Sequence, residues 1–110
     1  MKLKVFYKEY FLGDLQIKKN GFVYNSSEEE CVAKKQYLLE ISEYSQLLGS
    51  KNKKSESLFE FFADIAENIK KRQDLVENAG ILEHDSNFDA LAKFSKLKQT
   101  KHHFYFATEN

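Results

Sequence analysis

The chain has 110 residues, the usual size of a single domain, which accommodates one hydrophobic core but no added catalytic lobe. A hydrophobic fraction of 42% and a charged fraction of 31% favour a packed globule over a disordered chain. Its 17 basic residues balance its 17 acidic ones, so no overall field draws the protein to nucleic acid or to an anionic membrane.

The sequence favours a cytoplasmic protein. Cys31 is the single cysteine and cannot form an internal disulfide, and no charged-then-apolar leader opens the chain. No apolar run approaches the roughly 20 residues that a membrane-spanning helix needs. The initial Met1 and the residues beyond the last expected strand favour a full-length protein. Because the chain contains no proline, we expect glycines and capping side chains to set the helix ends.

The N-terminal quarter has the pattern of a β-meander. Apolar residues occupy every second position from Leu3 to Tyr7, as in a half-buried strand. Asn20 and Gly21 then stand between two apolar runs, which is the strongest short-range hairpin signal because a type I′ turn needs positive φ at both central residues. We predict a three-stranded antiparallel meander over residues 2–25.

The next segment begins with a helix-start signal. Ser27 and Glu30 have capping-box spacing, and acidic side chains favour the positive end of a helix dipole. The acidic run Glu28–Glu30 therefore indicates a helix start rather than a metal site, since consecutive carboxylates point in different directions around a helix. Residues 31–48 keep helical spacing but also alternate as a strand would. Helix is favoured there, and a strand remains the alternative.

The central segment Ser57–Val76 has the strongest helical pattern in the chain. Four apolar residues fall at offsets of 0, 4, 7 and 11 and form one face: Leu58, Phe62, Ile65 and Ile69. The segment that precedes it, Gly49–Ser57, has no apolar residue and is predicted to be a solvent-exposed loop.

The ends of this central helix are also predicted. Ser55 or Ser57 caps the start, the helix runs to about Asn78, and Gly80 supplies the left-handed stop. Polar and basic residues over Asn68–Arg72 interrupt the apolar stripe and mark a kink or a break.

The C-terminal part is predicted to contain a short helix, capped by Asp85 or Ser86, and a closing strand over His102–Ala107. The basic residues from Lys93 to Lys101 are typical of a helix C-terminus. The predicted fold is α+β, one domain over residues 1–110, with a small antiparallel sheet (the meander plus the closing strand) packed against about three helices.

Motifs for nucleotide, metal or nucleophilic chemistry are missing. The four glycines are scattered, and the sequence has no Cys-x-x-Cys pair and no His-Glu-x-x-His helix. His102 and His103 would face opposite sides of a strand and could not share one ion. Cys31 has no orienting group or oxyanion hole in the pattern. We therefore predict no catalytic residue, no cofactor and no metal.

The order of several motifs resembles the N-terminal subdomain of the HipA family of bacterial serine/threonine kinase toxins. The matching segments are YFLGDLQI, NGFVYN, FEFFADIAENIKKRQDLV, NFDALAKF and HHFYFA. They are similar to the family's Gly-Asp-Leu hairpin, its F-x-Y strand, its F-x-F-F helix, its F-D-x-L segment and its closing strand. The proline that ends the family's central helix is absent here, as is its Gly-rich segment before the last strand.

The resemblance implies a non-catalytic role. The family's ATP-binding and catalytic residues lie in sequence that follows this subdomain, so none is carried over. Without these residues, the chain resembles a stand-alone form of the subdomain, the antitoxin HipS of three-component HipBST systems, which binds a separately encoded kinase. We therefore expect an antitoxin that docks on the N-terminal lobe of a HipA-like kinase, in a complex that can include a HipB-like DNA-binding protein. The residues expected to bind the partner are Lys54, Phe59, Glu60, Asp64 and Arg72.

The sequence offers two other functions. The basic residues Lys93 to Lys101 offer an alternative as a nucleic-acid-binding or DNA-complex accessory protein, which requires binding that weakens steeply with salt. Phe104 and Tyr105 could stack bases, but aromatics on a terminal strand are more often core. A small enzyme has no supporting set of residues. No membrane association is expected.

Overall fold

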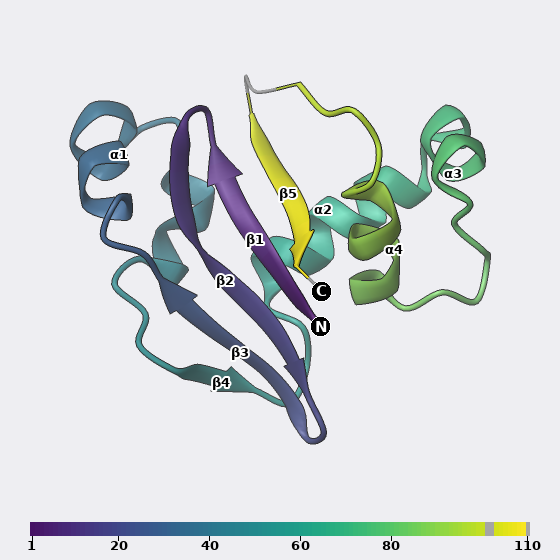
Figure 1. Cartoon of the computed structure of the whole chain (residues 1–110), viewed down its shortest axis with the longest axis horizontal. Helices are drawn as coiled ribbons and strands as arrows, with labels where there is room; N and C mark the ends of the chain where they lie inside the picture. Colours follow the sequence, from purple (N-terminus) through teal and green to yellow (C-terminus); the bar gives the residue numbers. More distant parts are fainter. Residues whose placement is uncertain (101–102, 110) are drawn as a thin grey trace.

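The computed structural model describes residues 1–100 and 103–109 and has the predicted α+β fold (Figure 1). Within this part of the chain, five antiparallel strands form one sheet in the order β4-β3-β2-β1-β5. The strands are β1 (Lys2–Tyr7), β2 (Tyr10–Lys18), β3 (Gly21–Ser26), β4 (Lys53–Ser55) and β5 (Phe104–Glu109). The helices are α1 (Glu30–Tyr37), the 3₁₀ helix η1 (Ser42–Leu47), α2 (Glu60–Lys70), α3 (Gln73–Ala79) and α4 (Asn87–Phe94).

The meander is confirmed, but its second turn is one residue away from the predicted position. Lys18 pairs with Gly21, so Lys19 and Asn20 form the two-residue turn, and neither has positive φ. Gly21 instead begins β3 with φ of 141°. A Cβ atom there would lie 2.2 Å from the Ser55 carbonyl oxygen, so only a glycine lets the backbone of the neighbouring strand β4 approach this closely.

A β-bulge shapes the middle of the meander. Val5 pairs with Gly13 and Phe6 with Phe11, which leaves Leu12 as the extra residue on β2. The Leu12 carbonyl accepts a hydrogen bond from the Ser27 backbone N–H at 2.7 Å. The bulge therefore connects β2 to the segment that leads into α1.

The segment after the meander forms α1 and η1, joined by a turn, with no strand between Cys31 and Leu48, so the favoured prediction of helix is confirmed over strand. The predicted capping box is wrong, because α1 begins at Glu30 with Glu29 at the N-cap and no side-chain cap. The Ser27 hydroxyl instead donates to the Phe11 carbonyl. The side chain of Glu30 is buried rather than placed at a solvated helix start.

The predicted loop Gly49–Ser57 contains the edge strand β4, so that prediction is wrong in part. Lys53 to Ser55 pair with β3 through their backbone, while the Lys53 and Lys54 side chains stay exposed. An edge strand with outward-facing lysines carries no apolar alternation. Its sequence therefore looks like a loop.

The central helix is two helices, with the break at the predicted place. The first, α2, ends at Lys70, and Arg72, which has an extended backbone, is the N-cap of α3. Gly80 provides the predicted left-handed stop, with φ of 71°. The predicted serine cap is wrong, because Phe59 occupies the N-cap without a side-chain hydrogen bond and Ser55 belongs to β4.

The C-terminal part agrees closely with expectation. Ser86 caps α4, and its hydroxyl accepts a hydrogen bond from the Asp89 backbone N–H at 3.1 Å. The closing strand β5 pairs with β1 along its full length. It starts at Phe104, two residues after the predicted start, and His102 lies outside the described residues.

The core lies between one face of the sheet and the helices α2 and α4, and buried residues of α1 and η1 extend it. In Figure 1, α2 crosses behind β1 and β5, and the ring of Phe62 packs against Phe106 and Tyr24. Phe62 and Ile69 of the predicted apolar stripe are buried there together with Ala66, whereas Ile65 is half-buried and Leu58 precedes the helix. In residues 1–100 and 103–109, no helix is long and apolar enough to cross a membrane.

Candidate functional site

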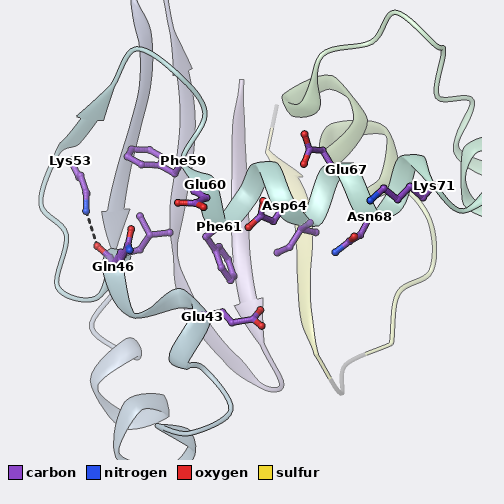
Figure 2. A pocket seen from close by; sticks show the side chains of 12 residues that line it. Glu43, Gln46, Lys53, Phe59, Glu60, Phe61, Asp64, Glu67, Asn68 and Lys71 are labelled. Carbon is purple, nitrogen blue, oxygen red and sulfur yellow. Dashed lines mark hydrogen bonds between the residues drawn. The ribbon is translucent and has the colours of Figure 1, made fainter.

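A groove of about 640 Å³ runs along the outer side of α2, between that helix, η1 and β4 (Figure 2). Its apolar surface comes from Leu47, Phe59, Phe61 and Ile65. Its polar rim comes from Glu43, Gln46, Lys53, Glu60, Asp64, Glu67, Asn68 and Lys71. The groove is therefore apolar along its floor and mainly acidic along its rim.

The floor is an extension of the hydrophobic core to the surface. The Phe61 ring lies edge-on against Phe104 at 4.9 Å and Tyr44 at 5.5 Å between centroids. Phe59, Phe61 and Ile65 are all half-buried, so packing on the inner side holds these side chains while their outer side lines the groove. A floor supported in this way presents a preformed apolar surface.

A buried polar network holds the η1 wall of the groove in place. The Tyr44 hydroxyl donates to Glu30 Oε2 at 2.5 Å, and Glu30 Oε1 accepts the Gly49 backbone N–H at 2.8 Å. Because the Tyr44 proton is committed to the carboxylate, the Tyr24 hydroxyl, 2.6 Å away, is the donor to Tyr44. Burial, as the largest cause, raises the pKa values of both tyrosines, so they stay neutral donors.

This network compensates for the only charged side chain that is buried among the described residues. The Glu30 side chain is enclosed, with an exposed fraction of 4%, and both of its oxygens are paired. A buried carboxylate without such partners would be strongly destabilising. The network links β3, α1, η1 and the chain before β4, and it thus fixes the wall that carries Glu43 and Leu47.

The rim carries four carboxylates and two amines. Within the described residues, none of the four carboxylates (Glu43, Glu60, Asp64 and Glu67) forms an ion pair or accepts a hydrogen bond. Lys53 Nζ donates to the Gln46 carbonyl at 2.7 Å, across the end of the groove nearest β4 (Figure 2). Lys71 stands at the opposite end. The middle of the rim is therefore negative.

The structure brings three of the five predicted partner-binding residues together. Phe59, Glu60 and Asp64 line the groove. Lys54 is exposed on β4, where it lines a shallow hollow beside the β2–β3 hairpin instead. Arg72 is exposed between α2 and α3 and forms an ion pair with Asp74 at 2.9 Å. Phe59 is half-buried and packs beside Phe62, so it belongs both to the core margin and to the groove.

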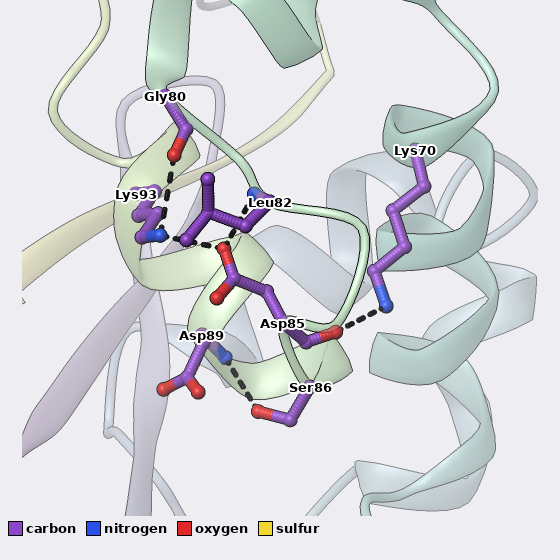
Figure 3. A network of polar contacts seen from close by, with 7 residues as sticks. All are labelled: Lys70, Gly80, Leu82, Asp85, Ser86, Asp89 and Lys93. Carbon is purple, nitrogen blue, oxygen red and sulfur yellow. Dashed lines mark hydrogen bonds and ion pairs between the residues drawn. The ribbon is translucent and has the colours of Figure 1, made fainter.

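The predicted basic segment is partly committed to a structural contact (Figure 3). Lys93 Nζ lies 2.6 Å from Asp85 Oδ2 and donates to the Gly80 carbonyl at 3.2 Å. The hydrogen bond from Lys93, and then that from the Leu82 backbone N–H, hold the pKa of Asp85 below its usual value. Lys96 and Lys98 are exposed, and Lys101 lies outside the described residues.

Metal and thiol chemistry find little support in the geometry. In the described ranges, no group of three or more His, Cys, Asp or Glu side chains is placed to hold a metal ion. Cys31 is an exposed free thiol on α1. Phe104 and Tyr105 are half-buried on β5, while Phe106 belongs to the core. These positions leave the groove as the strongest candidate site.

Sequence reasoning missed the η1 wall and part of the rim. Glu67 could have been found, because Glu60, Asp64 and Glu67 fall at i, i+4 and i+7 on one side of the central helix. The contribution of Glu43 could not, because tertiary contacts such as those of Tyr44 and Leu47 bring η1 to the groove.

Comparison of the chain with protein-family models, curated proteins and solved structures found no match.

Proposed function

We propose that this protein is a non-catalytic interaction module, an antitoxin that binds and neutralises a separately encoded HipA-like serine/threonine kinase in the cytoplasm. The observation that carries the proposal is the groove beside α2, where a preformed apolar floor and unpaired carboxylates are open to a partner. The segment that resembles the family's F-x-F-F helix supplies Phe59, Phe61 and most of the acidic rim. The resemblance supplies the kinase as the partner.

Neutralisation would follow from docking on the N-terminal lobe of the kinase. A rigid domain held there replaces the covalent subdomain of one-chain toxins and prevents productive ATP binding or lobe closure. Phe59 is the aromatic anchor of this contact, since hot spots of protein interfaces are enriched in aromatic side chains that fill pockets. A HipB-like DNA-binding protein would join the same complex through the kinase.

The test is capture with the tagged chain from its native host, followed by mass spectrometry and phosphorylation assays of any HipA-like kinase recovered. The unaltered chain should retain the kinase and suppress its autophosphorylation. Phe59→Ala should remain folded, because the side chain is only half-buried, and should lose most of the inhibition. Leu39→Ala is the matched control, because Leu39 is 89% exposed and lies outside the groove. Full inhibition by Phe59→Ala, or recovery of no kinase, would contradict the proposal.

The alternative function, nucleic-acid or DNA-complex binding through Lys93 to Lys101, stays a proposal of its own. The pairing of Lys93 with Asp85 leaves Lys96 and Lys98 as its exposed cations among the described residues. Binding of single- or double-stranded DNA that weakens steeply between about 50 and 200 mM salt would support it. Absence of binding at the lower salt concentration would exclude it.

A further inference from the structure

We propose that the groove beside α2 binds a basic amphipathic segment of the partner, in which lysine or arginine side chains flank an apolar one. The inference rests on the proposed function, because it names the partner chemistry of the same site. It is carried by the floor, by the charge of the rim and by the length of the groove.

The floor selects an apolar side chain. Phe59, Phe61 and Ile65 are half-buried at the surface of an otherwise closed core, and the buried Leu47 of η1 also lines the groove. An apolar side chain placed on these residues would be removed from water, at a gain of about 25 cal/mol per Å² of buried area. A fully polar ligand would gain nothing from this surface.

The rim selects positive charge. It carries four carboxylates against the amines of Lys53 and Lys71, although the whole chain has no net charge. The Lys53 amine is already bonded to Gln46 at one end of the groove. The negative charge is therefore local to this surface, and it repels nucleic acid and acidic peptides while it attracts lysine and arginine.

The position of Asp64 on α2 is unfavourable for the isolated protein. Asp64 lies four residues after Glu60 and three before Glu67, and like charges at these spacings destabilise a helix. Glu60 is favoured by the helix dipole in the first turn, but no described side chain forms an ion pair with Asp64. Unfavourable local choices of this kind are expected at functional sites, where a ligand supplies the missing compensation.

The length of the groove fits a short peptide segment. From Glu60 to Lys71 the helix rises about 16 Å, at roughly 1.5 Å per residue. A partner helix of about three turns, or about five residues of extended chain, covers the same distance. Such a segment places an apolar residue on the floor and basic residues against both walls.

The proposal is tested with two labelled synthetic peptides that share the same leucines and differ only in their flanking residues, lysine in one and glutamate in the other. Fluorescence anisotropy with the full chain should detect binding of the lysine peptide alone, and this binding should weaken as salt is raised. Asp64→Lys should weaken it about tenfold or more. Glu83→Lys is the matched control, because Glu83 is exposed and lies outside the groove. Equal binding of both peptides, or equal loss in the two variants, would overturn the proposal.

Capture of the kinase separates this inference from the function on which it rests. Kinase that is retained equally by the unaltered chain and by Asp64→Lys would leave the antitoxin role standing and would overturn the role of the groove. Charge-selective peptide binding without any kinase would support the groove and contradict the antitoxin role. If the unaltered chain forms a dimer and both Asp64→Lys and Lys96→Glu dissociate it, the groove is occupied by a second copy of this chain. That result would overturn the proposal.

Discussion

Replacement of Tyr44 by phenylalanine tests the buried network that supports the groove wall. The change removes one oxygen that donates to Glu30 and accepts from Tyr24. A hydrogen bond to a charged group contributes about 1.5–3 kcal/mol, and an unsatisfied buried hydroxyl costs about 1–3 kcal/mol. Relaxation recovers part of this sum, so we expect a loss of about 3 kcal/mol in the free energy of unfolding.

Urea denaturation measured by circular dichroism gives that free energy directly. For a domain of this size the loss corresponds to a fall of about 12 °C in Tm. Tyr37→Phe is the matched control, since Tyr37 is half-buried and its hydroxyl makes no hydrogen bond within the described residues. The control should change stability by less than about 0.5 kcal/mol. A loss below about 1 kcal/mol in Tyr44→Phe, or an equal loss in both variants, would refute the reasoning.

Three further variants test other contacts. Gly13→Ala should destabilise the fold by more than about 2 kcal/mol in urea denaturation, because a Cβ atom would lie 2.3 Å from the Asn25 carbonyl oxygen; tolerance without loss would show that the strands can separate. The pKa of Asp85 is lowered in the folded protein, chiefly by the hydrogen bond from Lys93. This pairing therefore stabilises the fold at pH values above 3.8, the ordinary pKa of an aspartate, and the stabilisation is lost as the pH falls through the folded-state pKa. Asp85→Asn should therefore be less stable than the parent at pH 7 but not near pH 2, and a difference independent of pH would contradict this. Asp64→Asn should raise the free energy of unfolding by about 0.2–0.5 kcal/mol through relief of like-charge repulsion on α2, whereas destabilisation would indicate a role for the carboxylate within the fold.

Local sequence signals predicted the parts of the fold that depend on local interactions. The apolar spacing of Phe62 and Ile69 placed the inner face of α2, since a helix must bury such a stripe whatever it packs against. The Ser86 cap and the Gly80 stop were confirmed for the same reason, because both act on backbone groups within a few residues.

Predictions failed where a distant strand decides the local structure. The turn after β2 lies one residue before its predicted position, because Gly21 is needed at the start of β3, where the Ser55 backbone of β4 packs closely against it. Ser55 itself could not cap α2, because its backbone pairs with β3. Neither effect is visible in sequence, since β4 has exposed lysines and no alternation of apolar residues.

For a related reason, the sequence predicted the α2 side of the candidate site but not the opposite wall. Glu60 and Asp64 were identified because they stand on the outer side of a helix whose inner side was clear. The opposite wall depends on Tyr44, which is drawn towards Glu30 and Tyr24 from elements distant in sequence. A pattern of residues cannot indicate a wall built by such long-range bonds.

The two faces of α2 connect stability with function in a way that single substitutions can separate. Its inner face buries Phe62, Ala66 and Ile69 against the sheet, and truncation of Phe62 there should unfold the domain. Its outer face carries exposed acids, of which Asp64 is one, whose removal leaves the core intact. A helix that served only the core would gain stability from a neutral residue in place of Asp64, which lies at helical spacing from both Glu60 and Glu67. The unpaired Asp64 therefore favours a role of this face in binding over a role in folding.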